Sequence, residues 1–541
     1  MEELDFSGLL ANCSDKGRTG YNPIMMYAVV TYANMRGVRS VDRIVDLCER
    51  DLAFIWLTRG QKPKRDAFYD FKNRKLTSDV LDDLNYQFMR RLQKEGLVTL
   101  KELFIDGTKI EANANRYTFV WRGSINYHLA GLLDSIDQLF EKYNSFLQEN
   151  DYGTKYELGN AQMFVIEGMD KVREVIEKNR KRKLVKHKKL SNNRIIEIGN
   201  CSPLEIRKLQ NNLTLIADNE GIEFVYGKGK RKPALQQLHE ELEQCGKRQI
   251  EYKECFEIMG KDRNSYSKTD LEATFMRMKE DYMLNGQLKP AYNVQIAVEN
   301  YFIVHGYVSS DRTDYNTLIP VLEKHKNAFG RILEEVTADS GYCSEKNLLY
   351  LKRNEISSYI KLQDHEKRKT RAYSEDISKY YNMRTGIFED EQFYICHDGR
   401  ELRHIRTETK EQNGYTQTFE VYACADCSGC EHKVRCLYKY NAEKDTERNK
   451  VMKINEQWEE LREKSHANIQ SERGILKRQT RSIQTEGHFG DIKENENFRR
   501  FNYRSADKVY KEFMLYAIGR NINKYCRFLN EKLKKFEGKT V

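Results

Sequence analysis

The spacing of apolar residues predicts short helices in the first hundred residues. Helices are expected over 24–36, where Pro23 suits a first helical position, and over 66–75, where aromatic residues mix with Lys and Arg. Between them, Ser40 suits an N-cap, and apolar residues follow at i, i+3, i+4 and i+7: Val41, Ile44, Val45 and Cys48. Short helices with a basic last member are typical of DNA-binding helix-turn-helix domains, but a helical packing domain has the same pattern. Both interpretations remain open for residues 1–100.

The pattern changes to strands after residue 101. Residues 103–108 form an apolar stretch that is expected to be a strand ending on Asp106, with Gly107 after it. Further along, the pattern predicts a hairpin of strands over 293–298 and 302–308, a helix over 315–326, a strand over 332–338 that ends on Asp339, a helix over 344–353 and an apolar strand over 356–362. Strands that alternate with helices in this way predict an α/β fold, with a mixed sheet and helices on its faces.

Residues 128–260 have a third pattern, which is long, charged and helix-forming. Apolar residues recur there with the helical period, at Leu129, Leu132, Leu133, Ile136, Leu139 and Phe140. Within this segment, residues 178–194 hold nine Lys or Arg and no acid, and residues 228–232 hold four more. Acids normally interleave on a solvated helix face, so contact with phosphates is the favoured interpretation. Lys181, Arg182 and Lys183 are the candidate DNA contacts of this run.

Length and charge narrow the class of protein. A chain of 541 residues exceeds one hydrophobic core, and 39% hydrophobic residues are too many for a disordered chain. No apolar run is long enough to cross a membrane, and the first residues lack the basic-then-apolar order of a signal peptide, so a cytoplasmic location is expected. The 92 Lys and Arg exceed the 82 Asp and Glu by ten, and residues 471–541 alone carry 17 against 9. This balance is compatible with a polyanionic partner.

Two aspartates share one sequence context. Asp106 and Asp339 each come at the predicted end of an apolar strand, and glycine follows each within two residues. Adjacent strand ends would bring the carboxylates together, and hard oxygen donors bind Mg²⁺ or Mn²⁺. Two such ions about 4 Å apart activate a water and stabilise the leaving oxygen of a phosphodiester. The alternative is that each aspartate only caps a strand end or a turn.

The third acid of such a site is expected in residues 482–493, which are predicted to be helical in spite of two glycines. Those glycines favour either tight packing on the sheet or close approach of DNA. Glu486 and Lys493 are seven residues apart, so a regular helix would present them on one face, the carboxylate toward the metals and the ammonium toward a phosphate. Glu334 and Glu335 are rivals, but their place inside the preceding strand favours an outward or structural role. Positive charge is added nearby by Arg481, Arg499, Arg500 and Arg504.

Cysteines are concentrated in one short stretch. The spacing Cys424-x2-Cys427-x2-Cys430-x5-Cys436, with Cys396 upstream, suits tetrahedral coordination of a structural Zn²⁺. Plain reduced thiols are a second interpretation, and an iron–sulfur cluster is a third, because a similar spacing occurs in iron–sulfur proteins. The catalytic metals want oxygen ligands, so a metal bound here would be structural or DNA-facing.

Five extended segments carry a family resemblance. In this order they are FIDGTKIEANANRYTFVW, SYSKTDLEATFMRMKEDYMLNGQLKPAYNVQIAV, SSDRTDYNTLIPVLE, TADSGYCSEKN and RSIQTEGHFGDIKENENFRRF. Together they resemble bacterial insertion-sequence transposases of the 1182 group, from about residue 17 to residue 523. Many long motifs in one order are far more specific than any single aspartate.

The resemblance implies an RNase H-like catalytic core with a DDE triad, which maps onto Asp106, Asp339 and Glu486 and holds two Mg²⁺ or Mn²⁺ ions. Lys493 resembles the lysine that follows the catalytic glutamate in the related tyrosine-arginine-glutamate-lysine signature. That signature has an arginine four residues before the glutamate, where this chain has Ser482, and Arg481 is one residue further. The resemblance also implies terminal inverted repeats and target DNA as partners, and a homodimer as the working form.

The domain organisation expected on this basis is a core split twice. A helical domain over 1–100 precedes a core built from 101–127, 261–365 and a C-terminal helix and basic tail over 465–541. A helical basic insertion over 128–260 and a cysteine-containing insertion over 366–464 interrupt that core. The expected protein is a nucleoid-associated bacterial DNA transposase. The alternatives are a nuclease that cuts without joining and a catalytically inactive, transposase-derived DNA-binding protein.

Overall fold

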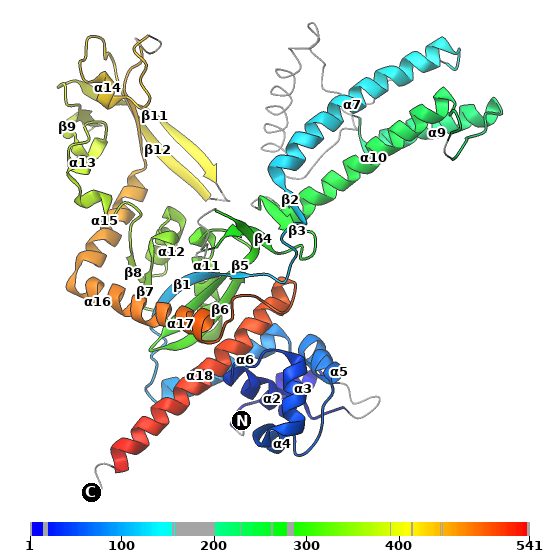
Figure 1. The fold of residues 1–541 in the computed structure, drawn as a ribbon. Coiled ribbons are helices and arrows are strands. Elements are labelled where there is room, and N and C mark those ends of the chain that lie inside the picture. Colours follow the sequence, from blue (N-terminus) through cyan, green and yellow to red (C-terminus); the bar gives the residue numbers. More distant parts are fainter. Residues whose placement is uncertain are drawn as a thin grey trace. The chain divides into compact units, whose positions relative to one another are not determined.

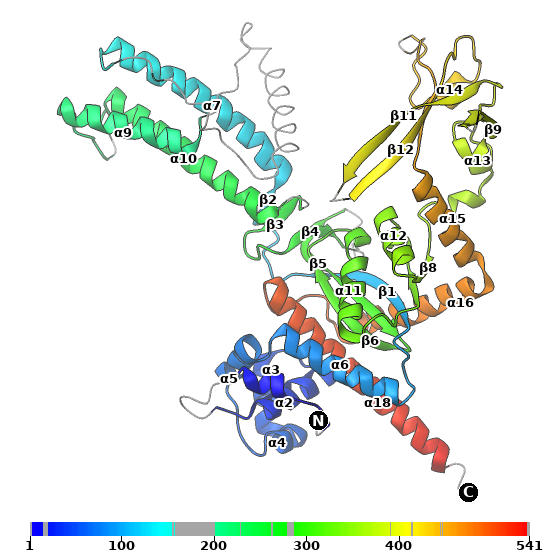
Figure 2. The same ribbon diagram turned by 180° about the vertical axis from the view of Figure 1, so that it is seen from behind.

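The computed structural model describes residues 3–13, 20–153, 156, 201–227, 229–260, 263–278, 286–389, 391–412, 415–443, 445 and 447–537. The basic run over 178–194, with Lys181, Arg182 and Lys183, lies outside the described residues. The chain divides into two compact units, one made of Met1–Glu111 with Tyr292–Val541 and one made of Ala112–Ala291 (Figures 1 and 2). Mixed strands and helices confirm the α/β class. No described helix is long and apolar enough to span a membrane.

The first unit contains a mixed sheet in the order β6-β5-β1-β7-β8. The strands are β1 (Glu102–Glu111), β5 (Leu288–Glu299), β6 (Phe302–Ser309), β7 (Glu335–Ala338) and β8 (Ser357–Ile360). The β5–β6 pair is antiparallel, as the alternating pattern predicted, whereas β1, β7 and β8 run parallel to one another. The first residues of β5, Leu288–Ala291, belong to the second unit and pair there with β4 (Thr274–Arg277).

Helices follow the strands of this sheet much as the sequence predicted. A 3₁₀ turn, η2 (Asp314–Asn316), leads into α11 (Leu318–Phe329), and another, η3 (Ser340–Tyr342), precedes α12 (Glu345–Arg353). Their apolar faces share one core with the sheet, in which Leu318, Leu322, Leu348 and Leu351 are buried beside Val336 and Ile360. Short local patterns therefore predicted this half of the unit well.

The strand that carries Asp106 is longer than predicted. We expected it to end on the aspartate, but β1 continues to Glu111, so Asp106 lies in the middle of the strand. The extended part of β1 contacts two distant segments. The backbone of Glu111 pairs with the segment around Arg500, accepting a hydrogen bond from Phe501 N at 2.9 Å, and Gly107 leaves room for the side chain of Gln295.

The N-terminal helices pack around the long C-terminal helix α18 (Ala506–Glu537), drawn in red beside the blue helices in Figures 1 and 2. They are α1 (Ser7–Ala11), α2 (Pro23–Met35), α3 (Val41–Arg50), α4 (Leu52–Leu57), α5 (Arg65–Asp70), η1 (Phe71–Lys75) and α6 (Ser78–Lys94). Gly519 permits the close approach of α18 to α2, because a Cβ there would lie 2.9 Å from Met35 N. Asn521 hydrogen-bonds both backbone groups of Ile303 and so covers part of the edge strand β6.

The cysteine-containing segment forms an antiparallel sheet of its own, in the order β13-β12-β11-β10-β9. Its elements are η4 (Lys367–Lys369), α13 (Arg371–Ser374), η5 (Tyr380–Asn382), β9 (Arg384–Phe388), β10 (Glu391–Ile395), β11 (Glu401–Gln412), β12 (Tyr415–Cys424), α14 (Lys433–Cys436) and β13 (Val451–Ile454). After it the chain returns through α15 (Glu456–Gln470), which packs on β8 and α12. In the sequence, the cysteine-containing segment thus lies between β8 and α15, which pack together in the same unit.

The second unit is mainly helical. It contains β2 (Phe119–Trp121), α7 (Arg122–Glu149), α9 (Pro203–Asn219), α10 (Ala234–Met259) and β3 (Ser265–Ser267), besides β4. The apolar positions that predicted a helix from residue 128 face its core, where Leu129, Leu132, Ile136 and Leu139 are buried against α9 and α10. The 3.6-residue period therefore predicted the buried face of α7 correctly. The domain boundaries and the assignment of these segments as insertions stay predictions.

Candidate active site

Parallel pairing of β1 and β7 brings the first two predicted acids together. Ile105 pairs with Ala338 in the register of the two strands. Asp106 and Asp339, which follow these paired residues, are therefore neighbours across the two strands. Side chains at matching positions of adjacent parallel strands project from the same face of a sheet. Asp106 is buried, with 8% of its surface exposed. The expectation that neighbouring strands bring these aspartates together is met, although Asp106 does not end its strand.

Asp106 is held by three donors. Its Oδ1 accepts a hydrogen bond from Gly107 N at 2.8 Å, and its Oδ2 accepts one from Arg481 Nη1 at 2.8 Å and one from Thr485 Oγ1 at 3.1 Å. A guanidinium offsets the cost of burying the carboxylate charge. The two side-chain donors come from the segment that was predicted to hold the third acid, so that segment lies against β1.

The segment is helical, as predicted, but its hydrogen bonding is irregular. It consists of α16 (Glu472–Arg481), the π-helical turn η6 (Ser482–Glu486), a short α17 (Gly487–Gly490) and a second π-helical turn η7 (Asp491–Asn495). A π turn changes the rotation per residue, and such turns are frequent at functional sites. Arg481, although one residue away from the expected arginine position, thus contacts the first aspartate. Because the two residues are 375 positions apart in the chain, sequence spacing could not place this contact.

The two glycines of α17 are not required by packing. A Cβ at Gly487 or Gly490 would meet nothing within 4 Å. The prediction that these glycines permit tight packing on the sheet is therefore wrong for both. The second interpretation, that they leave the helix surface open to a ligand, is compatible with this space.

Glu486 is not brought into contact with the two aspartates. Its side chain is exposed and makes no hydrogen bond or ion pair to the residues that the structure describes. Its neighbour Thr485 contacts Asp106, whereas Gln484 and His488 hydrogen-bond the backbone of Tyr301. Across the described parts of the chain, no three His, Cys, Asp or Glu side chains form a group that could hold a metal ion.

The remaining candidates of this region have varied surroundings. Lys493 is buried, and its backbone oxygen accepts a hydrogen bond from Arg499 Nε at 3.1 Å. Arg499 also pairs with Glu494, and Arg500 joins the end of β1 through the backbone. The rival acids are engaged elsewhere: Glu334 pairs with Lys101, and Glu335 pairs with Arg473 and Lys477. These ion pairs give Glu334 and Glu335 structural roles.

A third aspartate, Asp314, lies beside Asp339 and was not singled out from the sequence. Its Oδ1 accepts hydrogen bonds from Asn293 Nδ2 at 2.7 Å and Gln295 Nε2 at 2.9 Å. Gln295 also bonds the hydroxyl of Tyr342, which follows Asp339 by three residues. Burial raises the pKa of Asp339, and the charges of Asp106 and Asp314 raise it further. The one feature of the sequence that could have pointed to Asp314 is its place as an acidic residue shortly after the β5–β6 hairpin.

The predicted zinc ligands are close to one another in the cysteine-containing sheet. Burial and its neighbour Cys427 raise the pKa of Cys424 to about 11, and the charge of Cys396 acts in the same direction. Cys436 has a raised pKa through burial, and the charges of Cys396, Cys427 and Cys430 contribute. Clustered thiols are compatible with a metal, but those described do not form a metal group, so structural zinc stays a prediction.

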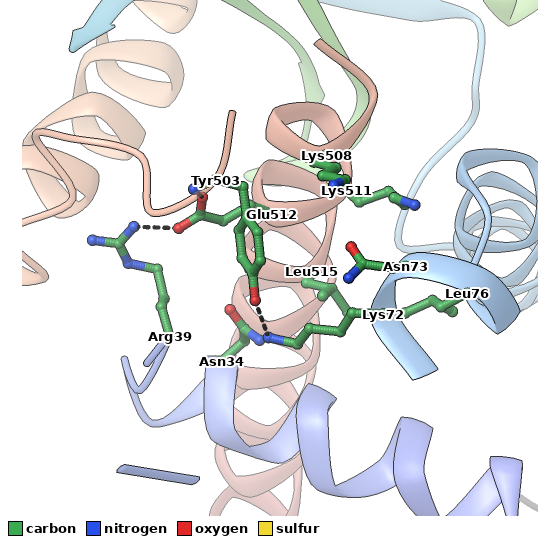
Figure 3. A pocket seen from close by; sticks show the side chains of 10 residues that line it. All are labelled: Asn34, Arg39, Lys72, Asn73, Leu76, Tyr503, Lys508, Lys511, Glu512 and Leu515. Atoms are coloured by element: carbon green, nitrogen blue, oxygen red, sulfur yellow. Dashed lines mark hydrogen bonds and ion pairs between the residues drawn. The ribbon is translucent and has the colours of Figure 1, made fainter. Parts of the chain in front are cut away.

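A small basic pocket lies where α18 meets α2 and η1 (Figure 3). Lys72 enters it with its ammonium 3.5 Å from Tyr503 Oη, and burial lowers the pKa of Lys72 to about 8. The only carboxylate among the lining side chains described, Glu512, already accepts hydrogen bonds from Arg39 and Asn502. This pocket therefore contains a buried cation that lacks a carboxylate of its own.

Two family models match the chain. The model described as Transposase domain (DUF772) matches residues 2–74, and the model described as Transposase DDE domain matches residues 395–526. The second match includes Glu486 and Arg481 but begins after Asp339. No curated protein and no solved structure matches the chain. The narrower resemblance to the 1182 group stays a prediction, but the two matches agree with the family to which the long motifs pointed. The matches over residues 2–74 and 395–526 support an insertion-sequence DDE transposase as the family of this chain.

Proposed function

We propose that the protein hydrolyses a phosphodiester at each end of its element and then uses the freed 3′-hydroxyl to attack target DNA. The observation that carries the proposal is the register of β1 and β7, which makes Asp106 and Asp339 neighbours. The strand order supports an RNase H-like core, since an antiparallel pair at one edge is followed by parallel strands, and the second acid comes at the end of β7.

The donor set fits divalent cations with a preference for oxygen. DDE transposases use such ions in general, and Asp106 and Asp339 would hold Mg²⁺ or Mn²⁺ here. Burial and, after it, repulsion from neighbouring carboxylates raise the pKa of Asp339, and a bound cation would offset this repulsion. When bound, the two ions supply an activated water and a stabilised leaving oxygen. Arg481 and Thr485 orient the carboxylate of Asp106 for this role.

Glu486 is the third acid of the proposal. Its exposed side chain is one residue from Thr485, which contacts Asp106, and we propose that a local change of the π turn moves the carboxylate toward the site. The open space at Gly487 and Gly490 suits the approach of DNA on this surface. Arg499 and Arg500, which are exposed, and Arg481 are the proposed DNA contacts here, and Lys181, Arg182 and Lys183 are proposed contacts of the basic run. The burial of Lys493 does not favour its predicted contact with a phosphate.

Further parts of the proposal concern organisation. Segments 128–260 and 366–464 are proposed as insertions into the core, and Cys424, Cys427, Cys430 and Cys436 as ligands of a structural zinc. We propose a homodimer, because two element ends must be processed together. DNA is the partner expected of a transposase, and the bacterial nucleoid is the proposed place of action.

The test is cleavage of DNA that carries the ends flanking this protein's own coding sequence. Wild-type protein should cut in Mg²⁺ or Mn²⁺, and Asp106→Asn should reduce the rate at least a hundredfold while leaving DNA binding unchanged. Specific end binding without any cleavage by the wild type would support the alternative of an inactive DNA-binding protein. The exposed Glu486, which does not contact the two aspartates, is compatible with that alternative. Cleavage that survives Asp106→Asn would contradict the assignment of the site.

A further inference from the structure

We propose that Asp314 supplies a further carboxylate to the cation site of Asp106 and Asp339 and is a catalytic residue of the reaction. This inference rests on the proposed function and deepens it. The site itself stands on the family match and on the β1–β7 register. The position of Asp314, which comes from another element of the fold, is independent of both.

Asp339 Oδ1 accepts a hydrogen bond from Gly341 N at 2.7 Å, and the surroundings of this glycine limit the distance between the two carboxylates. A Cβ at this glycine would be 3.0 Å from Asp339 Oδ1 and 3.1 Å from Asp314 Oδ2. The two oxygens are therefore at most about 6 Å apart. The described aspartates do not form a metal-holding group of three by themselves, and we propose that two bound ions about 4 Å apart draw the carboxylates together across this span. Any larger residue at 341 would fill the space between them. The glycine thus keeps the volume between the two carboxylates free.

Asp314 is held in this position by buried amides. Asn293 and Gln295 lie two residues apart on β5, are almost fully buried, and direct their amide groups at Asp314 Oδ1. Its Oδ2 receives no hydrogen bond from the described residues and is the oxygen on the Asp339 side. Buried amide groups need hydrogen-bond partners, and both of these amides donate to the same oxygen of Asp314. The two hydrogen bonds therefore hold the carboxylate in one orientation.

The same amides connect Asp314 to the other aspartate. Gln295 packs against Gly107, the residue after Asp106, where a Cβ would clash with its side chain. Gln295 also bonds Tyr342, in the turn that follows Asp339. One buried side chain therefore joins the three segments that carry the three carboxylates.

A helix-capping role does not account for Asp314. The N-cap of α11 is Thr317, and no side chain caps that helix by a hydrogen bond. The backbone oxygen of Asp314, and not its carboxylate, accepts from Thr317 N at 3.1 Å and from Thr317 Oγ1 at 2.9 Å. The carboxylate is therefore directed toward the site while the backbone forms the turn.

The experiment compares Asp314→Asn with Asp311→Asn, which removes the same charge from the same loop. Mn²⁺ binding to DNA-free protein, measured by electron paramagnetic resonance titration, and end cleavage are both recorded. We expect Asp314→Asn to weaken Mn²⁺ binding and to slow cleavage, each at least tenfold. Asp311→Asn should stay within twofold of the wild type in both measurements. Equal effects of the two substitutions, or no effect of Asp314→Asn on Mn²⁺ binding, would overturn the inference.

Asp106→Asn, measured in parallel, separates this inference from the proposed function. If Asp106→Asn abolishes cleavage and Asp314→Asn does not slow it, the result supports the proposed active site and refutes the role of Asp314. If cleavage survives Asp106→Asn, the proposed function itself falls. Should Asp314→Asn fold poorly, Fe²⁺-generated hydroxyl radicals can map the site in wild-type protein. Backbone cuts near residues 106, 314 and 339 support the inference, and cuts near 106 and 339 without 314 refute it.

Discussion

Replacement of Lys72 by Met should stabilise the junction between the N-terminal helices and α18. Burial lowers the pKa of Lys72 to about 8 from its ordinary 10.5, so the charged form is disfavoured in the folded protein. At 1.36 kcal/mol per pKa unit, this difference corresponds to a folding penalty of about 3 kcal/mol at pH 7. The penalty is complete below pH 8 and disappears as the pH rises from 8 to 10.5, because the lysine then becomes neutral in the unfolded chain too.

Native-state hydrogen exchange of peptides from α2 and α18 measures this effect. Lys72→Met keeps the apolar stem and should raise the local free energy of unfolding by about 3 kcal/mol at pH 7, with a much smaller gain at pH 10. Lys508→Met, at an exposed lysine that also lines the pocket, is the matched control and should change little. A loss of stability in Lys72→Met at pH 7, or a gain that does not depend on pH, would refute the reasoning.

Further substitutions test other contacts. Gly519→Ala should lower stability by at least about 2 kcal/mol in thermal unfolding, because its Cβ would overlap the backbone of Met35. Gly487→Ala should instead stabilise its helix by about 1 kcal/mol, because its Cβ meets open space; slower end cleavage in this variant would indicate that DNA approaches there. Arg481→Met leaves the Asp106 carboxylate without its charged donor and should slow cleavage at least tenfold in single-turnover assays in which all the DNA is bound by protein. Unchanged cleavage in Arg481→Met would remove the orienting role of this arginine.

Local patterns predicted the parts of the fold that depend on nearby residues. The β5–β6 hairpin, α12 and the buried face of α7 follow from alternation or helical period within short windows. The neighbourhood of Asp106 and Asp339 was also predictable, because both aspartates follow apolar strand residues that end up paired. These features need no information from distant parts of the chain.

The features that sequence reasoning missed depend on distant segments. The extension of β1 to Glu111 requires the backbone around Arg500, almost 400 residues later. The position of Asp314 becomes meaningful only when Gln295 and Gly341 are placed around it. The contact between Arg481 and Asp106 joins residues that are 375 positions apart in the chain, which no local residue spacing predicts.

The joining of pre-cleaved DNA tests the central claim most directly. Linear DNA with the element's own ends and free 3′-hydroxyls is incubated with protein, Mg²⁺ and a circular target, and joined product is measured. The account predicts joined product with wild-type protein and at least a hundredfold less with Asp106→Asn. Cleavage of uncut ends without joining would support a nuclease instead, and joining that persists in Asp106→Asn would contradict the active site described above.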